Sequence, residues 1–256
     1  MTRFLFCLLA LLLLEGCTPS PETAGAEGPT VVPDNARAMA EKLQLLASHG
    51  DAKAQYHLAV FYNNGLIGDG PDPLRAMEWF EKSAAGGDPL AHYKLGCYHH
   101  GQWKILPEDG LRALEHYRVA AKAGYSRAQF GVASLLLERN NTDEALPWLK
   151  AAGEQGDIFS LGTLFTLYHR GEGVARNDVR AYRYLLLALK ADGSLKSSKT
   201  DALQEELAAV ISPEAKHEVE DAAAAWHPKP SALTHEAHSG LRAVQQFLAS
   251  HAGTTP

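Results

Sequence analysis

Four segments of similar sequence, each beginning with a small residue, follow one another along this chain. The four copies begin at Ala54, Ala91, Ala128 and Ser160, so successive starts are 37, 37 and 32 residues apart. A glycine stands four residues before each start, and three of these glycines are followed by Asp51, Asp88 and Asp157. Self-similarity with a period of about 20–50 residues is the signature of arrays of stacked units. The chain is therefore expected to build its core from repeats rather than as one globule.

A second helical pattern follows each copy and keeps a register of its own. Its reference alanines are Ala76, Ala113, Ala145 and Ala181. Four residues before each alanine stands a residue that caps helices well, namely Asp72, Asp109, Asn141 and Asn177. Each unit is thus a hairpin of two short helices, whose apolar face is buried only when the next hairpin stacks on it. We predict an all-α fold, an α-solenoid of stacked antiparallel helix hairpins.

The residues of these units resemble a known family. Leu95-Gly96, the loop 171–174 and the run 150–157 match the Sel-one-like repeat, a relative of the tetratricopeptide repeat. The third unit lacks the Gly-rich loop and is closer to a tetratricopeptide repeat, which accounts for the shorter step. The segment 211–226 is similar to the helix that often closes such arrays. The resemblance covers about residues 36–227 and implies a fold that binds other proteins.

The first residues are typical of an export signal. Arg3 precedes an apolar run, Phe4–Leu14, that is far shorter than the roughly 20 residues of a membrane-spanning helix. The run leads into Leu14-Glu15-Gly16-Cys17, which resembles a bacterial lipobox, although Glu15 stands where a small uncharged residue is usual. We predict a lipoprotein with Cys17 lipidated. Thr18, not aspartate, follows Cys17, and analogy with enterobacterial lipoprotein sorting then implies a location at the outer membrane, facing the periplasm. A plain secretory signal or a tail-less anchor is the alternative.

The chain is expected to comprise five regions. These are a lipoprotein signal peptide (1–16), a flexible tether (17–33), an N-terminal capping helix (34–49), four repeats with closing helices (50–227), and a C-terminal capping helix with a tail (228–256). In the last region Leu241, Val244, Phe247 and Leu248 share one helical face. That face favours capping of a terminal repeat, whose apolar flank is otherwise exposed. Binding of a partner is the alternative.

Charge and motif content argue against catalysis and nucleic-acid binding. The 24 basic residues against 30 acidic ones give a net charge of −6, and no basic stripe is present. His235 and His238 are three residues apart, whereas the zinc-protease motif needs a spacing of four. The two common serine-enzyme signatures are absent, and Cys97 is the single thiol left after export and lipidation. We therefore predict no enzyme, no metal and no cofactor.

Two surfaces are candidates for binding a protein. In the related tetratricopeptide arrays, the first helix of each hairpin lines the concave side. The register places there Lys53, Tyr56, Asn63, Asn64, Tyr93, His99, His100, Arg127, Phe130, His169 and Arg170. The three aromatic members occupy one equivalent position, where packing inside the repeat is the alternative. Arg127, His169 and Arg170 are the better contact residues.

The second surface is the loop 102–107, which replaces the usual small Gly-rich connection. If this loop is exposed, Trp103, Ile105 and Leu106 would form an apolar anchor of the kind that dominates protein interfaces. The alternative is that the loop folds back over its hairpin.

The sequence thus predicts a lipoprotein that binds another protein, touching the membrane through its lipid anchor only. The family resemblance implies two roles for such lipoproteins. Some are immunity proteins that neutralise phospholipase effectors of type VI secretion, and others are scaffolds for envelope or exopolysaccharide assembly. We expect the immunity role, because scaffolds tend to be longer. A β-lactam-binding or hydrolysing enzyme is a third alternative, although members of that kind are stapled by disulfides.

Overall fold

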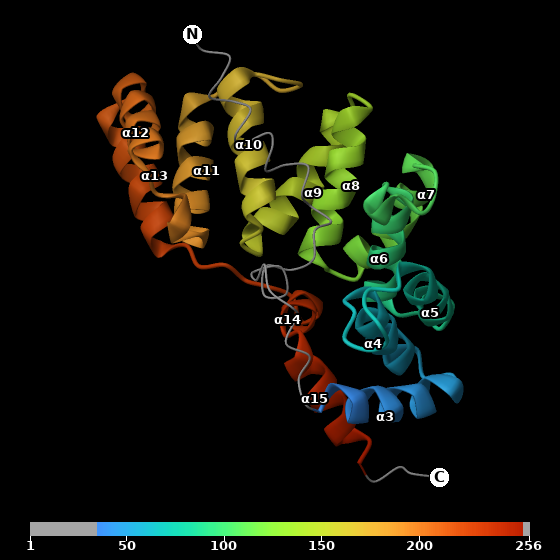
Figure 1. Ribbon diagram of the computed structural model, residues 1–256. Coiled ribbons are helices and arrows are strands. Elements are labelled where there is room, and N and C mark those ends of the chain that lie inside the picture. Colours follow the sequence, from blue (N-terminus) through green and yellow to red (C-terminus); the bar gives the residue numbers. More distant parts are fainter. Residues whose placement is uncertain (1–34, 253–256) are drawn as a thin grey trace. The chain divides into compact units, whose positions relative to one another are not determined.

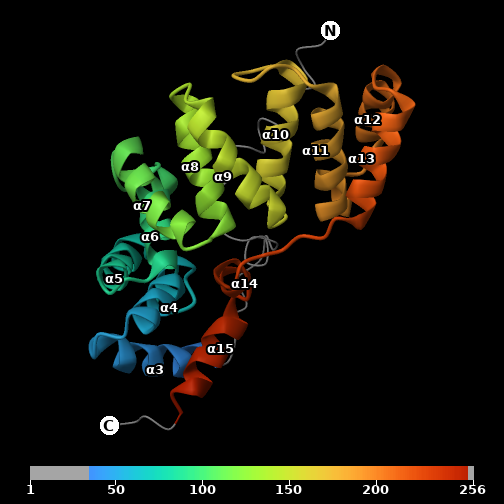
Figure 2. The ribbon, with the colours of Figure 1, turned by 180° about the vertical axis from the view of Figure 1, so that it is seen from behind.

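The computed structural model describes residues 35–252 (Figures 1 and 2). This part of the chain contains thirteen α-helices, two short 3-10 helices and no strand. The predicted all-α fold is confirmed. The helices form two compact units, which we call the N-terminal unit (residues 35–124 with 232–252) and the central unit (residues 125–231).

The N-terminal unit contains the first two hairpins. Its elements are α3 (Ala36–Ser48), α4 (Ala52–Asn63), α5 (Pro73–Ala85), α6 (Pro89–His99), η1 (Gln102–Lys104), α7 (Gly110–Lys122), α14 (Ala232–His238) and α15 (Leu241–Ser250). Helix α4 packs against α5, and α6 packs against α7, so each repeat is an antiparallel pair. Helices α14 and α15 come from the far end of the sequence and lie in the same unit.

The central unit contains the third and fourth hairpins and the closing helices. Its elements are α8 (Ser126–Glu138), α9 (Thr142–Glu154), α10 (Ile158–Arg170), α11 (Asp178–Ala191), η2 (Gly193–Leu195), α12 (Ser198–Val210) and α13 (Pro213–Ala225). Figures 1 and 2 show α10, α11, α12 and α13 side by side. Helices α12 and α13 both pack on α11, where Ala223 joins Leu161, Leu187 and Ala188 in one cluster. Helices α12 and α13 therefore cover the fourth repeat.

Helix starts follow the capping pattern of the sequence. The side chains of Asp51, Asp88 and Asp157 accept hydrogen bonds from backbone N–H groups in the first turns of α4, α6 and α10. The second helices are capped in the same way by Asp72, Asp109, Asn141 and Asn177. Helix α8 is the exception among the repeat helices, because its N-cap is Tyr125, which makes no side-chain cap. These caps satisfy N–H groups that a helix cannot pair internally.

Small residues let the two helices of a hairpin approach closely. Gly96 lies inside α6, and a Cβ added there would meet the Tyr117 ring of α7 at 2.5 Å. Tyr117 is almost fully buried. The Leu-Gly pair of the repeat thus makes room for an aromatic ring from the second helix. Gly171 ends α10 with a φ of 73°, a left-handed conformation that costs glycine little.

Helix α15 covers α3, and these are the last and the first helices of the described residues. Val244 is buried in a cluster with Met39, Ala40 and Leu43 of α3, and Phe247 and Leu248 pack on the same cluster. The amphipathic face of the C-terminal region is therefore occupied inside the N-terminal unit. The closing role in the central unit belongs to α12 and α13 instead.

The predicted signal peptide, lipobox and tether, including Glu15 and Cys17, lie outside the described residues. Within residues 35–252, none of the helices combines the length and the apolar character needed to cross a bilayer.

Candidate interaction surfaces

The three equivalent aromatic residues are buried, and the expectation that they line an exposed face is wrong. Tyr56, Tyr93 and Phe130 retain 9%, 7% and 6% exposure. Each ring packs on another aromatic ring: Tyr56 on Phe80, Tyr93 on Tyr117, and Phe130 on Phe159, with centroids 5.7–5.9 Å apart. Apolar burial and ring pairing stabilise the hairpins here. These three residues therefore pack inside the repeats, which was the alternative interpretation of their common position.

Asn63 is likewise buried rather than exposed, at 4%. Its Oδ1 accepts a hydrogen bond from the Tyr98 hydroxyl at 2.8 Å, and its Nδ2 donates to Asn64 Oδ1 at 3.0 Å. A buried amide costs free energy unless such partners satisfy it. Asn63 therefore links the first two repeats, and the expectation of a surface contact is corrected.

Two ion pairs join successive repeats at equivalent positions. Lys53 Nζ lies 3.2 Å from Asp88 Oδ2 in the N-terminal unit, and Arg127 Nε lies 3.3 Å from Asp157 Oδ2 in the central unit. Each cation immediately precedes the alanine that begins its repeated segment, Ala54 or Ala128, and each acid is the N-cap of the next first helix. Arg127 also lies over the Phe159 ring, 4.4 Å from its centroid. Arg127 is thus committed to an inter-repeat contact.

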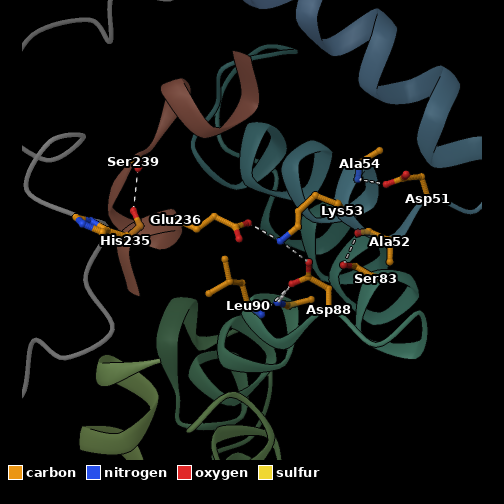
Figure 3. A network of polar contacts seen from close by, with 11 residues as sticks. Asp51, Ala52, Lys53, Ala54, Ser83, Asp88, Leu90, His235, Glu236 and Ser239 are labelled. Atoms are coloured by element: carbon orange, nitrogen blue, oxygen red, sulfur yellow. Dashed lines mark hydrogen bonds and ion pairs between the residues drawn. The ribbon is translucent and has the colours of Figure 1, made fainter. Parts of the chain in front are cut away.

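Lys53 has a further acidic partner from the C-terminal segment. Figure 3 shows Lys53 between Asp88 and Glu236 of α14, with a contact to each carboxylate. Burial alone lowers the pKa of Lys53, but hydrogen bonds and the charges of Glu236 and Asp88 outweigh it, so the pKa is raised overall. The Thr234 hydroxyl of α14 donates to the Gly124 carbonyl at 3.4 Å. The first-helix side around Lys53 is therefore covered by the chain's own α14.

His100, another predicted contact residue, is half-buried. Its Nδ1 lies 3.4 Å from the Tyr117 hydroxyl, and the two rings meet edge-on. The neighbouring His99 stacks on His116 of α7 with an interplanar angle of 8°, and His116 Nδ1 lies 3.0 Å from His92 Nδ1. Burial lowers the pKa of all three clustered histidines, and that of His116 falls to about 4.

His169 and Arg170 lie at the end of α10. The His169 ring stacks on Phe165 with centroids 5.3 Å apart, and its buried Nδ1 has no hydrogen-bond partner within the described residues. Arg170 is exposed, and its Nη1 lies 3.1 Å from Glu172 Oε1. Among the first-helix residues that we predicted to contact a partner, Arg170 is the exposed one, and the others are buried or half-buried.

The loop 102–107 is half-buried. Trp103 and Lys104 have positive φ angles of 67° and 52°, which side chains rarely adopt. Trp103, Ile105 and Leu106 are each intermediate between buried and exposed. The loop is therefore neither a free apolar anchor nor a buried segment. Backbone strain of this kind persists only where the surrounding structure holds it.

A small basic pocket in the central unit was not predicted. It has a volume of about 310 Å³ and is lined by Lys150, Glu154, Tyr168, Arg180, Arg183 and Tyr184. The residues come from α9, α10 and α11, so two repeats contribute to it. On α11, Arg180, Arg183 and Tyr184 are spaced so that they share one face of the helix. This spacing is the one sequence pattern that indicates a wall of the pocket.

The part of the chain that the structure describes contains no group of three or more His, Cys, Asp or Glu arranged to hold a metal. Cys97 lies in the core with 1% exposure. A buried thiol of this kind packs as a small apolar side chain.

Comparison with known proteins agrees with the hairpin architecture. The model of the Sel1 repeat family matches residues 52–88, 89–125, 126–157 and 158–192. An uncharacterised protein of Neisseria meningitidis serogroup B is 34% identical over 139 residues, which are 54% of this chain and 28% of that protein. Chitin synthase regulatory factor 3 of Schizosaccharomyces pombe is 30% identical over 146 residues, which are 54% of this chain and 16% of that protein. The chain thus spans less than a third of the length of these relatives.

Two solved structures have a similar fold. One is a protective antigen of uropathogenic Escherichia coli that displays an SLR fold, with a TM-score of 0.62, 23% identity, and coverage of 97% of this chain and 49% of that one. The other is a Sel1 repeat protein from Oxalobacter formigenes, with a TM-score of 0.60, 20% identity, and coverage of 84% and 86%. Four consecutive family matches span more than half of the sequence. The chain belongs to the Sel1 repeat family.

Proposed function

We propose that this chain acts by binding another protein through its Sel1 repeats and needs no catalysis of its own. The observation that carries the proposal is the uninterrupted run of four repeats over residues 52–192. Stacked hairpins present ordered side chains along extended faces, and the Sel1 scaffold is suited to protein–protein interaction. The buried aromatic positions hold the hairpins together, while the half-buried loop 102–107 and the exposed Arg170 offer contact points.

The finer proposal is an immunity lipoprotein. In it, Cys17 is lipidated, the repeats face the periplasm from the outer membrane, and the protein partner is a phospholipase effector of type VI secretion. The short apolar run before a lipobox-like sequence supports the anchor. The presence of four matched repeats supports an inhibitor that binds a single target.

The second candidate is a scaffold or regulator of envelope or exopolysaccharide assembly. It is favoured by the similarity to a protein whose name describes the regulation of chitin synthase. Under this proposal the chain would bind a synthase or its partners rather than a toxin.

Rescue from toxicity separates the two candidates. A phospholipase effector of type VI secretion is exported to the periplasm of cells with and without the full-length chain. Survival that depends on the chain supports the immunity role. Failure of rescue, together with loss of polymer export when the gene is deleted, supports the scaffold. Nitrocefin turnover by the purified protein, abolished by one side-chain change, would contradict both.

Affinity capture tests which surface is used. We expect Trp103→Ala or Arg170→Ala to weaken capture of the partner while circular dichroism shows unchanged helicity. Val210→Ala is the matched control, because Val210 is 61% exposed and lies on α12, outside the four matched repeats. Capture that neither Trp103→Ala nor Arg170→Ala alters would exclude these two contact sites.

A further inference from the structure

The pocket of the central unit is basic and partly aromatic. Three of its six lining residues are cations and one, Glu154, is an acid. Tyr168 and Tyr184 stack with ring centroids 5.8 Å apart and an interplanar angle of 10°, which forms a flat wall. Arg180 lies over the Tyr168 ring at 5.1 Å, and its Nη1 donates to the Tyr168 hydroxyl at 3.3 Å. Arg180 is thereby held in place beside the wall.

Two of the cations are available to a ligand. Among the residues that the structure describes, no carboxylate pairs with Lys150 or Arg183, and the Tyr184 hydroxyl has no hydrogen-bond partner. Glu154 lines the pocket as well, and its Oε2 accepts a hydrogen bond from Trp226 Nε1 at 3.4 Å. Unpaired donors that converge on one pocket are the usual recognition groups for an anion.

The pKa of Tyr184 depends on burial and on the charged groups that surround its hydroxyl. Burial raises the pKa of Tyr184, and the neighbouring Tyr168 and, to a smaller extent, Glu154 add to that effect. Arg183 and Arg180 act in the opposite direction, because their charges favour the phenolate. The two guanidinium charges thus favour an anion at this wall, and the carboxylate of Glu154 opposes it.

The size of the pocket limits what it holds. Pockets for drug-sized ligands range over about 300–1,000 Å³, so a volume of about 310 Å³ suits one small group. A glutamate or aspartate side chain has both the small size and the negative charge that this pocket requires. Its carboxylate can accept hydrogen bonds from Arg183, Lys150 and the Tyr184 hydroxyl, while its methylene groups lie against the stacked rings.

We infer that this pocket binds an acidic side chain of the protein partner, in a segment rich in glutamate or aspartate. The inference rests on the proposed protein-binding function and adds the chemistry of the partner. The whole protein carries a net charge of −6 and repels acidic peptides in general. Binding of such a peptide therefore reports a local basic site rather than bulk charge.

The test uses the full chain and an acetylated, amidated hexaglutamate peptide in isothermal titration calorimetry. We expect hexaglutamate to bind and the neutral hexaglutamine peptide not to bind. The double variant K150Q/R183Q should weaken hexaglutamate binding about tenfold, because it removes both free cations. The charge-matched control K196Q/K199Q lies in the same unit, near the start of α12, and should bind within about twofold of the unaltered chain.

Three results would overturn the inference. They are an absence of hexaglutamate binding at millimolar peptide, an equal loss in K150Q/R183Q and K196Q/K199Q, and binding of inorganic phosphate without binding of hexaglutamate. Circular dichroism of both double variants checks that the helices persist. If the unaltered chain captures its partner and K150Q/R183Q captures it equally well, this inference fails while the proposed function stands. If the unaltered chain captures no protein at all, the proposed function fails.

Discussion

At the scale of single residues, Gly96 shows how a repeat position is fixed by its neighbour across the hairpin. Alanine would favour the helix by about 1 kcal/mol over glycine. Its Cβ, however, would lie 2.5 Å from the Tyr117 ring, and overpacking of this kind costs about 1–3 kcal/mol. We expect Gly96→Ala to lower the free energy of unfolding by about 1 kcal/mol, measured by urea denaturation.

Gly193→Ala is the control for this prediction. A Cβ at Gly193 meets nothing within 4 Å, so the free energy of unfolding should change by less than about 0.5 kcal/mol. Equal effects of the two substitutions would show that the Tyr117 contact does not select glycine at position 96.

We expect His57 of α4 to make the stability of the N-terminal unit sensitive to acid. Burial, with a smaller contribution from the charge of Lys53, lowers its pKa to about 3 from 6.5. The folded state keeps the ring neutral, whereas the unfolded chain binds a proton below about pH 6.5, so stability falls as the pH drops from 6.5 towards 3. Each such histidine contributes a slope of about 1.4 kcal/mol per pH unit.

We expect His57→Phe to reduce the pH dependence of unfolding between pH 6.5 and 4.5 by about one proton's slope. The measurement is urea denaturation at several pH values, and the slope is compared rather than the absolute stability. His217→Gln is the control, since His217 is an exposed residue of α13. An unchanged slope in His57→Phe would mean that His57 is not held neutral in the folded protein.

At the scale of elements, α15 stabilises the N-terminal unit by covering α3. Val244 is 3% exposed within the cluster that includes Leu43, and an aspartate there would bury an unpaired charge. We expect Val244→Asp to lower the free energy of unfolding by about 3 kcal/mol or more. Gln245→Asp places the same charge on the exposed side of α15 and should have little effect. Similar losses in both variants would contradict the packing of α15 on α3.

The sequence predicted the elements that depend on local signals. Caps such as Asp88 and Asn177 act within one turn of their helices, so the hairpins and their starts could be assigned residue by residue. The destination of α15 could not be predicted, because the spacing of Leu241 and Val244 defines an apolar face but not the surface that it covers. The burial of Tyr56 could not be predicted for a related reason: the repeat register shows which positions are equivalent, but not how exposed they are.

Contacts between repeats were also hard to predict, because local sequence patterns do not show which surfaces meet in the fold. The pairs Lys53–Asp88 and Arg127–Asp157 follow a common register and could have been found by aligning the repeats. The basic pocket gathers side chains from three helices, so the spacing on α11 showed only one of its walls. Glu236 reaches Lys53 from 183 residues away, and no local pattern indicates that contact.

At the scale of the whole molecule, the account stands on the claim that the Sel1 repeats bind a protein. Photo-crosslinking in the producing cells tests this most directly, with p-benzoylphenylalanine placed at position 103, 170 or 210 of the full-length chain. Positions 103 and 170 lie within the matched repeats, and position 210 lies on α12, outside them. The account predicts a covalent adduct to one and the same protein from positions 103 and 170 and none from position 210. An adduct from position 210 alone, or no adduct from any position, would contradict it.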